Sequence, residues 1–223
     1  MAINKAQTPV WMKAVLVVLA IVFVFGFISI GASPFMTDAT QQQTTTPAAG
    51  SLDAVNQQFQ PTVSALTAQL QSDPESYTVL VSLGNTYFDW AAQLQQASQT
   101  TTANVGADQP IWVAAKDAYS RALAVKEGES PVTVDYAITL FYTGETTKAI
   151  KTATDVTKAD PEFAQAYLNL GIFNKVLGQS EEALANYEKF LELDPDGATG
   201  NTEFVESEIA ALKGGATAAP STP

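Results

Sequence analysis

The sequence contains neither cysteine nor histidine in its 223 residues. Without cysteine there can be no disulfide, no thiolate metal site and no thiol catalysis. Without histidine the chain lacks the usual general base near neutral pH and the commonest metal ligand. Nucleophile–base pairs and phosphate-binding loops are also absent from the sequence. We therefore predict no catalytic residue, no metal site and no cofactor; a carboxylate pair with a perturbed pKa in a cleft would reopen the question of an enzyme.

Basic residues are scarce as well. The chain has 11 Lys and Arg against 23 Asp and Glu, for a net charge of −12, and every acidic residue lies after residue 37. A field of this sign repels phosphate backbones. Binding to nucleic acid is therefore not expected.

A long apolar run occurs near the start of the chain, at residues 14–31, which read AVLVVLAIVFVFGFISIG without a charge. At about 1.5 Å per residue, a helix of this length spans roughly 27 Å, close to the apolar thickness of a bilayer. Trp11 and Lys13 precede the run, and both side chains favour a membrane interface. We predict a transmembrane helix at 14–31, with a cleaved signal peptide as the alternative.

The distribution of lysine predicts the orientation of this helix. Lys5 and Lys13 precede it, and the next basic residue is Lys116. The positive-inside rule then places residues 1–13 in the cytoplasm and the rest of the chain outside it, as a single-pass protein of the cell membrane. Residues 32–50 are rich in Thr, Gln, Ala and Pro and have no apolar period, so they are predicted to be a flexible linker.

Apolar residues recur at helical spacing through the rest of the chain. A lead-in helix is predicted at 51–72, where Pro61 is expected to kink or split it. The Asp-Pro pair at 73–74 is expected to start a helix, with Asp as N-cap and Pro in the first turn. The predicted repeat domain covers 73–213, with helix pairs at about 77–129, 130–161 and 162–195, a capping helix at about 200–212, and a disordered tail at 214–223.

A period of 34 residues relates the second helices of these pairs. The residues in register are Ala115, Ala149 and Ala183; Tyr119, Ala153 and Tyr187; and Ala122, Val156 and Phe190. Gly84 and Gly171 in the first helices are 87 apart, which is two periods plus 19, so we place a 19-residue insertion at 91–109. Gly and Ala at these positions allow two helices to approach closely, and the aromatic residues fill the space beside them.

These segments resemble the tetratricopeptide repeat (TPR) family. The resemblance rests on LGNTYFDW (83–90), AAKDAYSRAL (114–123), AYLNLGIF (166–173) and EEALANYEKFLELDP (181–195). It implies an all-α fold, a TPR-type α-solenoid of three helix pairs with a lead-in helix and a C-terminal capping helix, after one transmembrane helix. The middle repeat departs from the pattern, because Tyr136-Ala137 replaces Leu-Gly and Ala153 replaces an aromatic residue. The anchor, lead-in helix and repeats together also resemble the repeat domain of bacterial cytochrome c biogenesis factors.

In this family the first helix of each pair lines a concave groove that binds protein partners. The corresponding positions are Val81, Asn85, Phe88, Asp89, Val134, Ile138, Phe141, Tyr142, Leu168, Ile172, Lys175 and Val176. Members that grip the C-terminal carboxylate of heat-shock chaperones use a set of Lys and Asn residues there, which these positions do not reproduce, so that activity is not expected. A mostly apolar groove suits an amphipathic helix or an extended peptide. Alternatively the chain fills its own groove with the lead-in helix, the insertion or a second copy.

The sequence thus predicts a membrane-anchored, extracytoplasmic TPR protein that acts through protein–protein interaction, as a scaffold or assembly factor. Its partner would be a protein or peptide whose identity the sequence does not indicate. Two alternatives remain open. One is a chaperone-like binder in cytochrome c biogenesis or in the assembly of secreted proteins. The other is a homotypic structural protein, whose partner is a second copy of the chain.

Overall fold

The computed structural model describes residues 51–98 and 106–217. The chain divides into two units, 1–45 and 46–223, and the described residues all belong to the second. The predicted anchor and linker lie outside the described residues. Among the helices that are described, none combines the length and the apolar character that crossing a bilayer requires.

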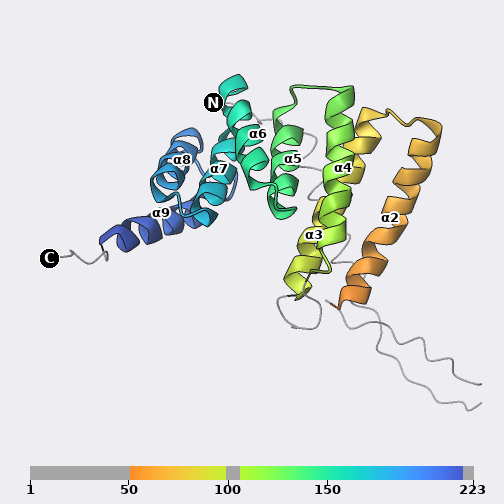
Figure 1. The fold of residues 1–223 in the computed structure, drawn as a ribbon, viewed down its shortest axis with the longest axis horizontal. Coiled ribbons are helices and arrows are strands. Elements are labelled where there is room, and N and C mark those ends of the chain that lie inside the picture. The colour runs from red at the N-terminus through yellow and green to blue at the C-terminus, as the bar shows by residue number, and fades with distance from the viewer. Residues whose placement is uncertain (1–50, 99–105, 218–223) are drawn as a thin grey trace, which may run out of the picture. The chain divides into compact units, whose positions relative to one another are not determined.

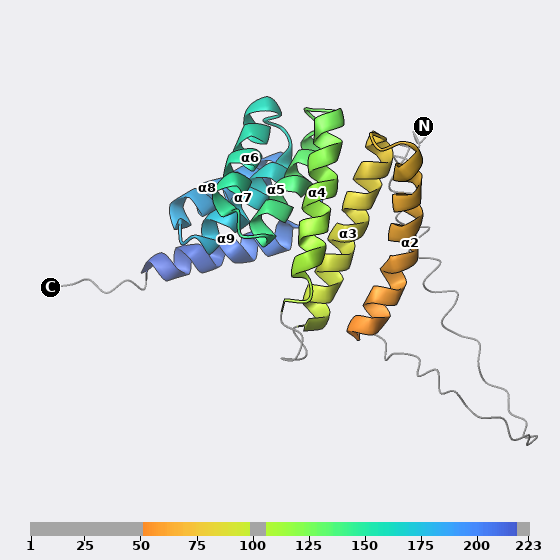
Figure 2. The same cartoon turned by 45° about the vertical axis from the view of Figure 1, so that its right-hand side comes forward.

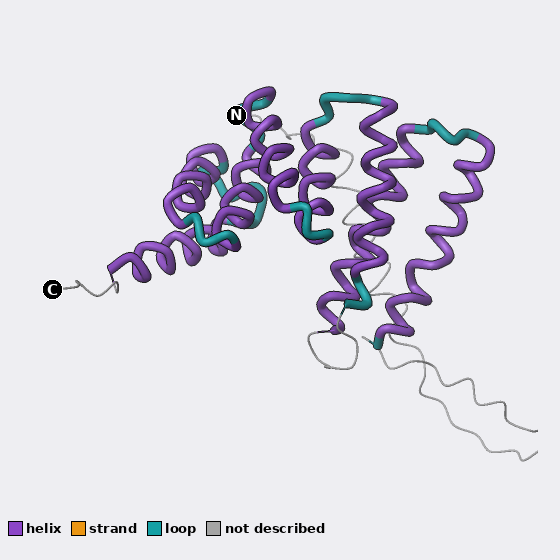
Figure 3. The backbone as a smooth tube through the Cα atoms, viewed as in Figure 1, coloured by secondary structure: helices purple, strands orange, loops and turns teal. Residues whose placement is uncertain are grey.

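The described part of the chain is all-helical, with eight helices and no strand (Figures 1 and 3). The helices are α2 (Leu52–Ser72), α3 (Tyr77–Ser98), α4 (Gln109–Val125), α5 (Ser130–Tyr142), α6 (Thr146–Ala159), α7 (Ala164–Val176), α8 (Ser180–Leu193) and α9 (Thr202–Thr217). Each helix packs against the next one in the sequence, and α5 also packs against α7 (Figures 1 and 2). The pairs α3–α4, α5–α6 and α7–α8 therefore form a solenoid that α2 precedes and α9 follows, which confirms the predicted all-α architecture.

The first and third pairs are held together by a tyrosine that lies on a glycine. The ring of Tyr119 on α4 packs so closely on α3 that a Cβ added at Gly84 would lie 2.6 Å from two ring carbons. Tyr187 on α8 packs on Gly171 of α7 in the same way. Both tyrosines are 1% exposed or less, so each pair has room for the ring because its first helix lacks a side chain at that point.

The middle pair reaches a similar closeness with smaller residues on both sides. Ala137 on α5 and Ala153 on α6 are both fully buried and belong to one core cluster. The two departures from the TPR pattern in this repeat thus compensate each other, because the methyl group added at 137 is balanced by the ring lost at 153.

The expectation that the Asp-Pro pair at 73–74 starts a helix is wrong, and the pair at 160–161 has the same arrangement. Asp73 is the C-cap of α2 and Asp160 the C-cap of α6, and the N–H of each donates to the carbonyl four residues earlier. Their own carbonyls accept a hydrogen bond from the N–H three residues later, at 3.2 Å in both cases. Each Asp-Pro pair therefore opens a β-turn with proline at its second position, where the fixed φ of proline is suitable. The next helix begins only at Tyr77 or Ala164.

Two smaller expectations also differ from the structure. Pro61 does not split α2, which continues through it as one helix of 21 residues, because proline removes a single N–H donor and leaves the bonds on either side. The capping helix α9 is longer than expected and continues to Thr217, so the predicted tail includes helical residues at 214–217. Residues 218–223 lie outside the described part.

The insertion placed at 91–109 is shared between helices and their connection. Helices α3 and α4 have 22 and 17 residues, whereas α7 and α8 have 13 and 14. Nine of the extra residues thus lengthen the first helix, three the second, and the remaining seven the connection. The lengthened α3 packs on α2, where Trp90 stacks on Phe59 and donates from Nε1 to Asn56 Oδ1 at 3.0 Å, and Leu94 is buried beside them. The lengthened α3 therefore extends the surface that holds the lead-in helix, to which Leu80 and Leu83 also belong.

Candidate functional site

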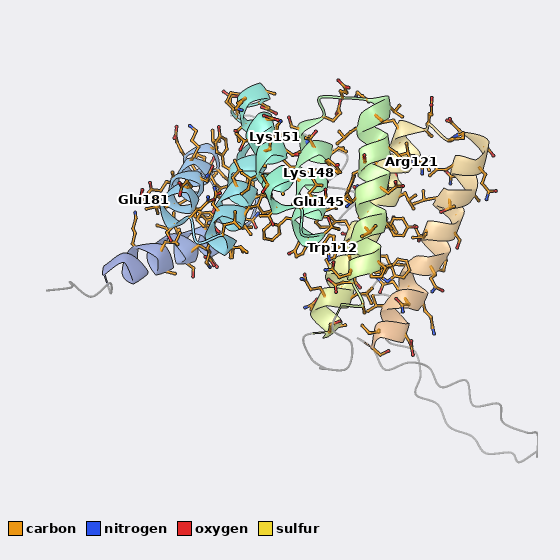
Figure 4. All side chains as sticks on the ribbon, viewed as in Figure 1. Trp112, Arg121, Glu145, Lys148, Lys151 and Glu181 are labelled. Carbon is orange, nitrogen blue, oxygen red and sulfur yellow. The ribbon has the colours of Figure 1, made fainter. Side chains whose placement is uncertain are left out.

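The first helices of the three pairs are nearly free of charge. Helices α3, α5 and α7 contain one charged residue each, namely Asp89, Asp135 and Lys175. Charged side chains concentrate on the second helices, where Figure 4 labels Arg121 on α4, Lys148 and Lys151 on α6, and Glu181 on α8. Among the ion pairs between described residues, only the pair of Lys175 with Glu208 on α9 includes a first-helix residue. The first helices therefore present a surface with far fewer charged side chains than the second helices do.

Ten of the twelve predicted groove positions are exposed or half-buried, and together they are named the first-helix face. They are Val81, Asn85, Phe88, Asp89, Ile138, Phe141, Tyr142, Ile172, Lys175 and Val176. The other two, Val134 and Leu168, are 3% and 6% exposed and pack in core clusters between helices. These two side chains support the face and cannot contact a partner directly, whereas a groove formed by the other ten stays a prediction.

Aromatic stacking fixes the large side chains of the first-helix face. The ring of Phe141 on α5 stacks on Phe173 of α7, with ring centroids 4.6 Å apart. Tyr142 stacks on Trp112 of α4 at 4.3 Å, and Phe88 of α3 meets the same indole edge-on at 5.0 Å. The rings thus connect neighbouring pairs as well as forming part of the face, so the face is held by the packing of the solenoid itself.

Two carboxylates, Asp89 on α3 and Asp135 on α5, interact electrostatically in the folded protein. Burial, and next the charge of Asp89, raise the pKa of Asp135 to about 7. The side chain of Asp89 is largely exposed, yet the protein atoms around it desolvate the carboxyl enough to raise its pKa. Both carboxylates also add to the effect of burial in raising the pKa of Tyr119, whose hydroxyl donates to Asn85 Oδ1 at 2.8 Å. Among the described residues, neither Asp89 nor Asp135 has an ion-pair or hydrogen-bond partner.

Two cavities of the described domain do not include this carboxylate pair. These cavities, of about 510 and 310 Å³, are both lined by residues of α3 and α4 and share Arg121, and neither contains a residue of the first-helix face or Asp135. Within the described ranges, no three acidic side chains come together as a candidate metal site. The pair therefore has a perturbed pKa and lies outside both of these cavities.

At the α7 end of the face, Lys175 forms an ion pair with the capping helix. Lys175 Nζ donates to a carboxylate oxygen of Glu208 on α9, so its positive charge is neutralised. Tyr187 is the counterpart of Tyr119, but the residue corresponding to Asn85 is Ile172, which cannot accept a hydrogen bond. The buried hydroxyl of Tyr187 accordingly has no partner among the described residues, and burial, then Glu208, raise its pKa to about 12.

Asp135 and Tyr119 contribute to this site but are absent from the groove positions read from the sequence. The register selects Val134 and Ile138, and Asp135 falls between them on an adjacent strip of the helix. One signal could have identified it, because Asp135 is the single charged residue in the 13 residues of α5. The role of Tyr119 could not be read in this way, because its ring is a core residue and only its hydroxyl reaches Asn85.

The comparison with protein families identifies one repeat. A family model described as Tetratricopeptide repeat matches residues 164–196, which contain α7 and α8. This segment is the one in which the quoted sequence patterns are most complete. No curated protein matches the chain.

Solved structures match over a larger part of the chain. The first TPR of Spaghetti (RPAP3), bound to the HSP90 peptide SRMEEVD, is 20% identical with a TM-score of 0.50, over 66% of this chain and 97% of that one. TTC0263, a TPR protein of Thermus thermophilus, is 17% identical with a TM-score of 0.54, over 72% of this chain and 78% of that one. At such identities the likeness concerns the fold. The chain thus contains a tetratricopeptide repeat at 164–196, within a helical domain that has the TPR fold.

Proposed function

We propose that this protein is a scaffold or assembly factor that is anchored in the membrane and binds a protein partner outside the cytoplasm through its first-helix face. The observation that carries the proposal is the contrast between the two kinds of helix. The second helices use their charges in ion pairs at the surface, whereas α3, α5 and α7 present half-buried apolar and aromatic side chains with few charges. A face of this kind is suited to an extended or helical protein segment.

The charges of the face argue against the ligand of one structural neighbour. The TPR of Spaghetti is bound to the acidic HSP90 peptide SRMEEVD. Such a peptide would meet the carboxylates of Asp89 and Asp135 here, and the one lysine of the face is neutralised by Glu208. The partner of this protein is therefore expected to belong to another class.

The location rests on the sequence. The apolar run at 14–31 is long enough for one crossing, and the basic residues Lys5 and Lys13 precede it. This arrangement supports a cytoplasmic N-terminus and a repeat domain on the other side of the membrane. The narrower likeness to cytochrome c biogenesis factors stays a prediction.

Two exposed valines allow a matched test of the binding face. Val176 on α7 is 65% exposed and belongs to the first-helix face, whereas Val113 on α4 is 51% exposed and belongs to a second helix. A photo-crosslinking amino acid would be placed at either position in the full-length protein and activated in intact cells. Captured proteins would be identified by mass spectrometry and then tested for binding to the purified protein.

We expect a defined partner to be captured from position 176 and not from position 113. Equal capture from both positions would contradict a specific face. Capture of the protein itself, from position 176 alone, would favour the homotypic alternative.

A further inference from the structure

The two cavities follow one another along helix α4, and Arg121 lines both of them. The cavity of about 310 Å³ lies between α2 and α4, with Leu83 and Tyr87 of α3 in its wall. The cavity of about 510 Å³ is lined by the turn after α2, by Leu80 of α3 and by the C-terminal end of α4. The α4 residues of the two linings are centred about six residues apart, which is roughly 9 Å along the helix. We name this pair of cavities the α4 groove.

Alanine lines the α4 groove at positions where the other second helices carry longer polar side chains. In the 34-residue register, Ala124 corresponds to Lys158 on α6 and Glu192 on α8. Ala114 likewise corresponds to a lysine on α6 and a glutamate on α8. Each of these alanines lines one of the two cavities. Helix α4 therefore lacks the polar side chains that cover α6 and α8 at the same positions.

Arg121 supplies the positive charge of the α4 groove. Its Nη2 donates to the carbonyl oxygen of Pro74 at 3.1 Å, and its Nη1 lies 3.9 Å from a carboxylate oxygen of Asp117, beyond hydrogen-bond distance. A guanidinium has five N–H donors, and the bond to Pro74 is the only one that the described residues provide. Asp117 and Glu75 also line the groove, but both side chains are exposed, so water weakens their repulsion of an incoming anion. Arg121 can therefore receive a carboxylate from outside the domain.

The spacing of these features matches one face of an amphipathic α-helix. Side chains at i and i+7 lie on one face of a helix, about 10.5 Å apart, which is close to the spacing of the two cavities. A side chain at i+3 or i+4 lies between them on the same face, where Arg121 lies between the cavities. A small molecule would need a site that encloses most of its surface, whereas both cavities are open to solvent on one side.

We propose that the α4 groove binds an amphipathic α-helix of a protein partner, with apolar side chains at i and i+7 in the two cavities and an Asp or Glu at i+3 or i+4 paired with Arg121. None of the residues that line the groove belongs to the first-helix face. The groove is thus a second interaction surface, beyond the one in the proposed function. A protein with two separate surfaces can hold two partners at once.

Selection of random 16-residue peptides displayed on phage tests the proposal, with the full-length protein purified in detergent as the bait. Phage that bind the Ala124→Gln variant, in which the larger cavity is filled from an exposed position, are removed first. We expect enrichment of helix-forming sequences with Leu, Ile, Met or Phe seven residues apart and Asp or Glu between them. Enrichment of proline-containing sequences, of a basic residue between the apolar ones, or of no pattern overturns the proposal.

Substitutions then assign the binding of the best peptide, with its Kd measured by fluorescence anisotropy. We expect the Kd to rise about fivefold when Gln replaces the acid of the peptide, as for one partly exposed ion pair. Arg121→Gln should remove this difference between the two peptides, and a loss of affinity that is equal for both would indicate a structural role of Arg121 and refute the inference. Ala114→Gln should raise the Kd about tenfold by filling the smaller cavity, while Ala185→Gln, the same change at an exposed position of α8 outside the groove, should leave it unchanged.

Light scattering of the full-length protein tests a second copy of the chain as the occupant. A mass that rises with concentration, and that Ala124→Gln returns to the monomer, would assign the groove to a second copy and overturn the proposal. A mass independent of concentration is expected. Failure of the crosslinking at Val176 would remove the proposed binding face and leave this inference intact, because Val176 does not line the groove.

Discussion

Replacing Asp135 by asparagine is expected to stabilise the domain at alkaline pH and to have little effect in mild acid. Asparagine keeps the size of the side chain but cannot ionise, so the substitution removes the cost of ionising a half-buried carboxyl group. The groups that interact with this carboxyl are Asp89 on α3 and Tyr119 on α4. Neither supplies a positive charge, so nothing in the described domain offsets the ionised form.

The magnitude follows from the pKa of Asp135, which burial and Asp89 raise from 3.8 to about 7 in the folded protein. The folded state therefore holds the proton more tightly than the unfolded state does. The resulting stability is present in full below about pH 4 and is lost as the pH rises through about 7. A shift of about three pH units corresponds to at most about 4 kcal/mol, at 1.36 kcal/mol per unit.

Urea unfolding of the full-length protein and the variant at pH 5 and pH 8 would measure this effect, with the fluorescence of the buried Trp90 and Trp112 as the signal. Asp135→Asn is expected to gain about 1–3 kcal/mol relative to the parent protein on going from pH 5 to pH 8. The exposed Asp196→Asn variant serves as the control, with no such gain. A free-energy difference for Asp135→Asn that is the same at both pH values, or a loss of stability at pH 8, would refute the reasoning.

Three further predictions test the packing and the topology. In chemical denaturation, Gly84→Ala should lower the free energy of unfolding by about 1–3 kcal/mol, because its Cβ would lie 2.6 Å from carbons of the Tyr119 ring. The same change at Gly214, where no atom would lie within 4 Å of the new Cβ, should be neutral or stabilising. Trp112→Phe should cost about 1–3 kcal/mol in the same assay, because it leaves the buried carboxylate of Asp108 without its indole donor, and an unchanged stability would contradict that account. Ser221→Cys should introduce the single thiol of the chain and react with a membrane-impermeant maleimide on intact cells, and lack of labelling would contradict an extracytoplasmic repeat domain.

The helix pairs were predictable because their packing leaves a pattern in the sequence. The period of 34 residues and the Gly and Ala positions arise from close contact between two helices, and such contact tolerates few side chains. The same reasoning located the insertion by its length, but not its distribution over α3, α4 and their connection. Helix ends were less predictable, because an Asp-Pro pair can cap a helix start or open a turn, and the choice depends on where the next helix finds its packing partner.

The candidate site, like the fold, was predicted from the sequence only in part. The first-helix face, including Asp89 and the aromatic positions, was read from sequence spacing alone, and its role as a groove stays a prediction. The same spacing also selected Val134 and Leu168, which neighbouring helices bury, and it omitted Asp135, because spacing along one helix does not reveal which neighbour covers a residue.

By itself, the sequence determined that the chain forms paired helices of the TPR type, that histidine and cysteine chemistry is absent, and that its first helices are nearly uncharged. These properties follow from composition and from local periodicity, which every helix expresses independently of its neighbours. Only the tertiary structure decided that Asp89 and Asp135, 46 residues apart, lie within reach of each other's charge. Electrostatic interactions depend on distance in space and on burial, and both are set by the way α3, α4 and α5 pack together.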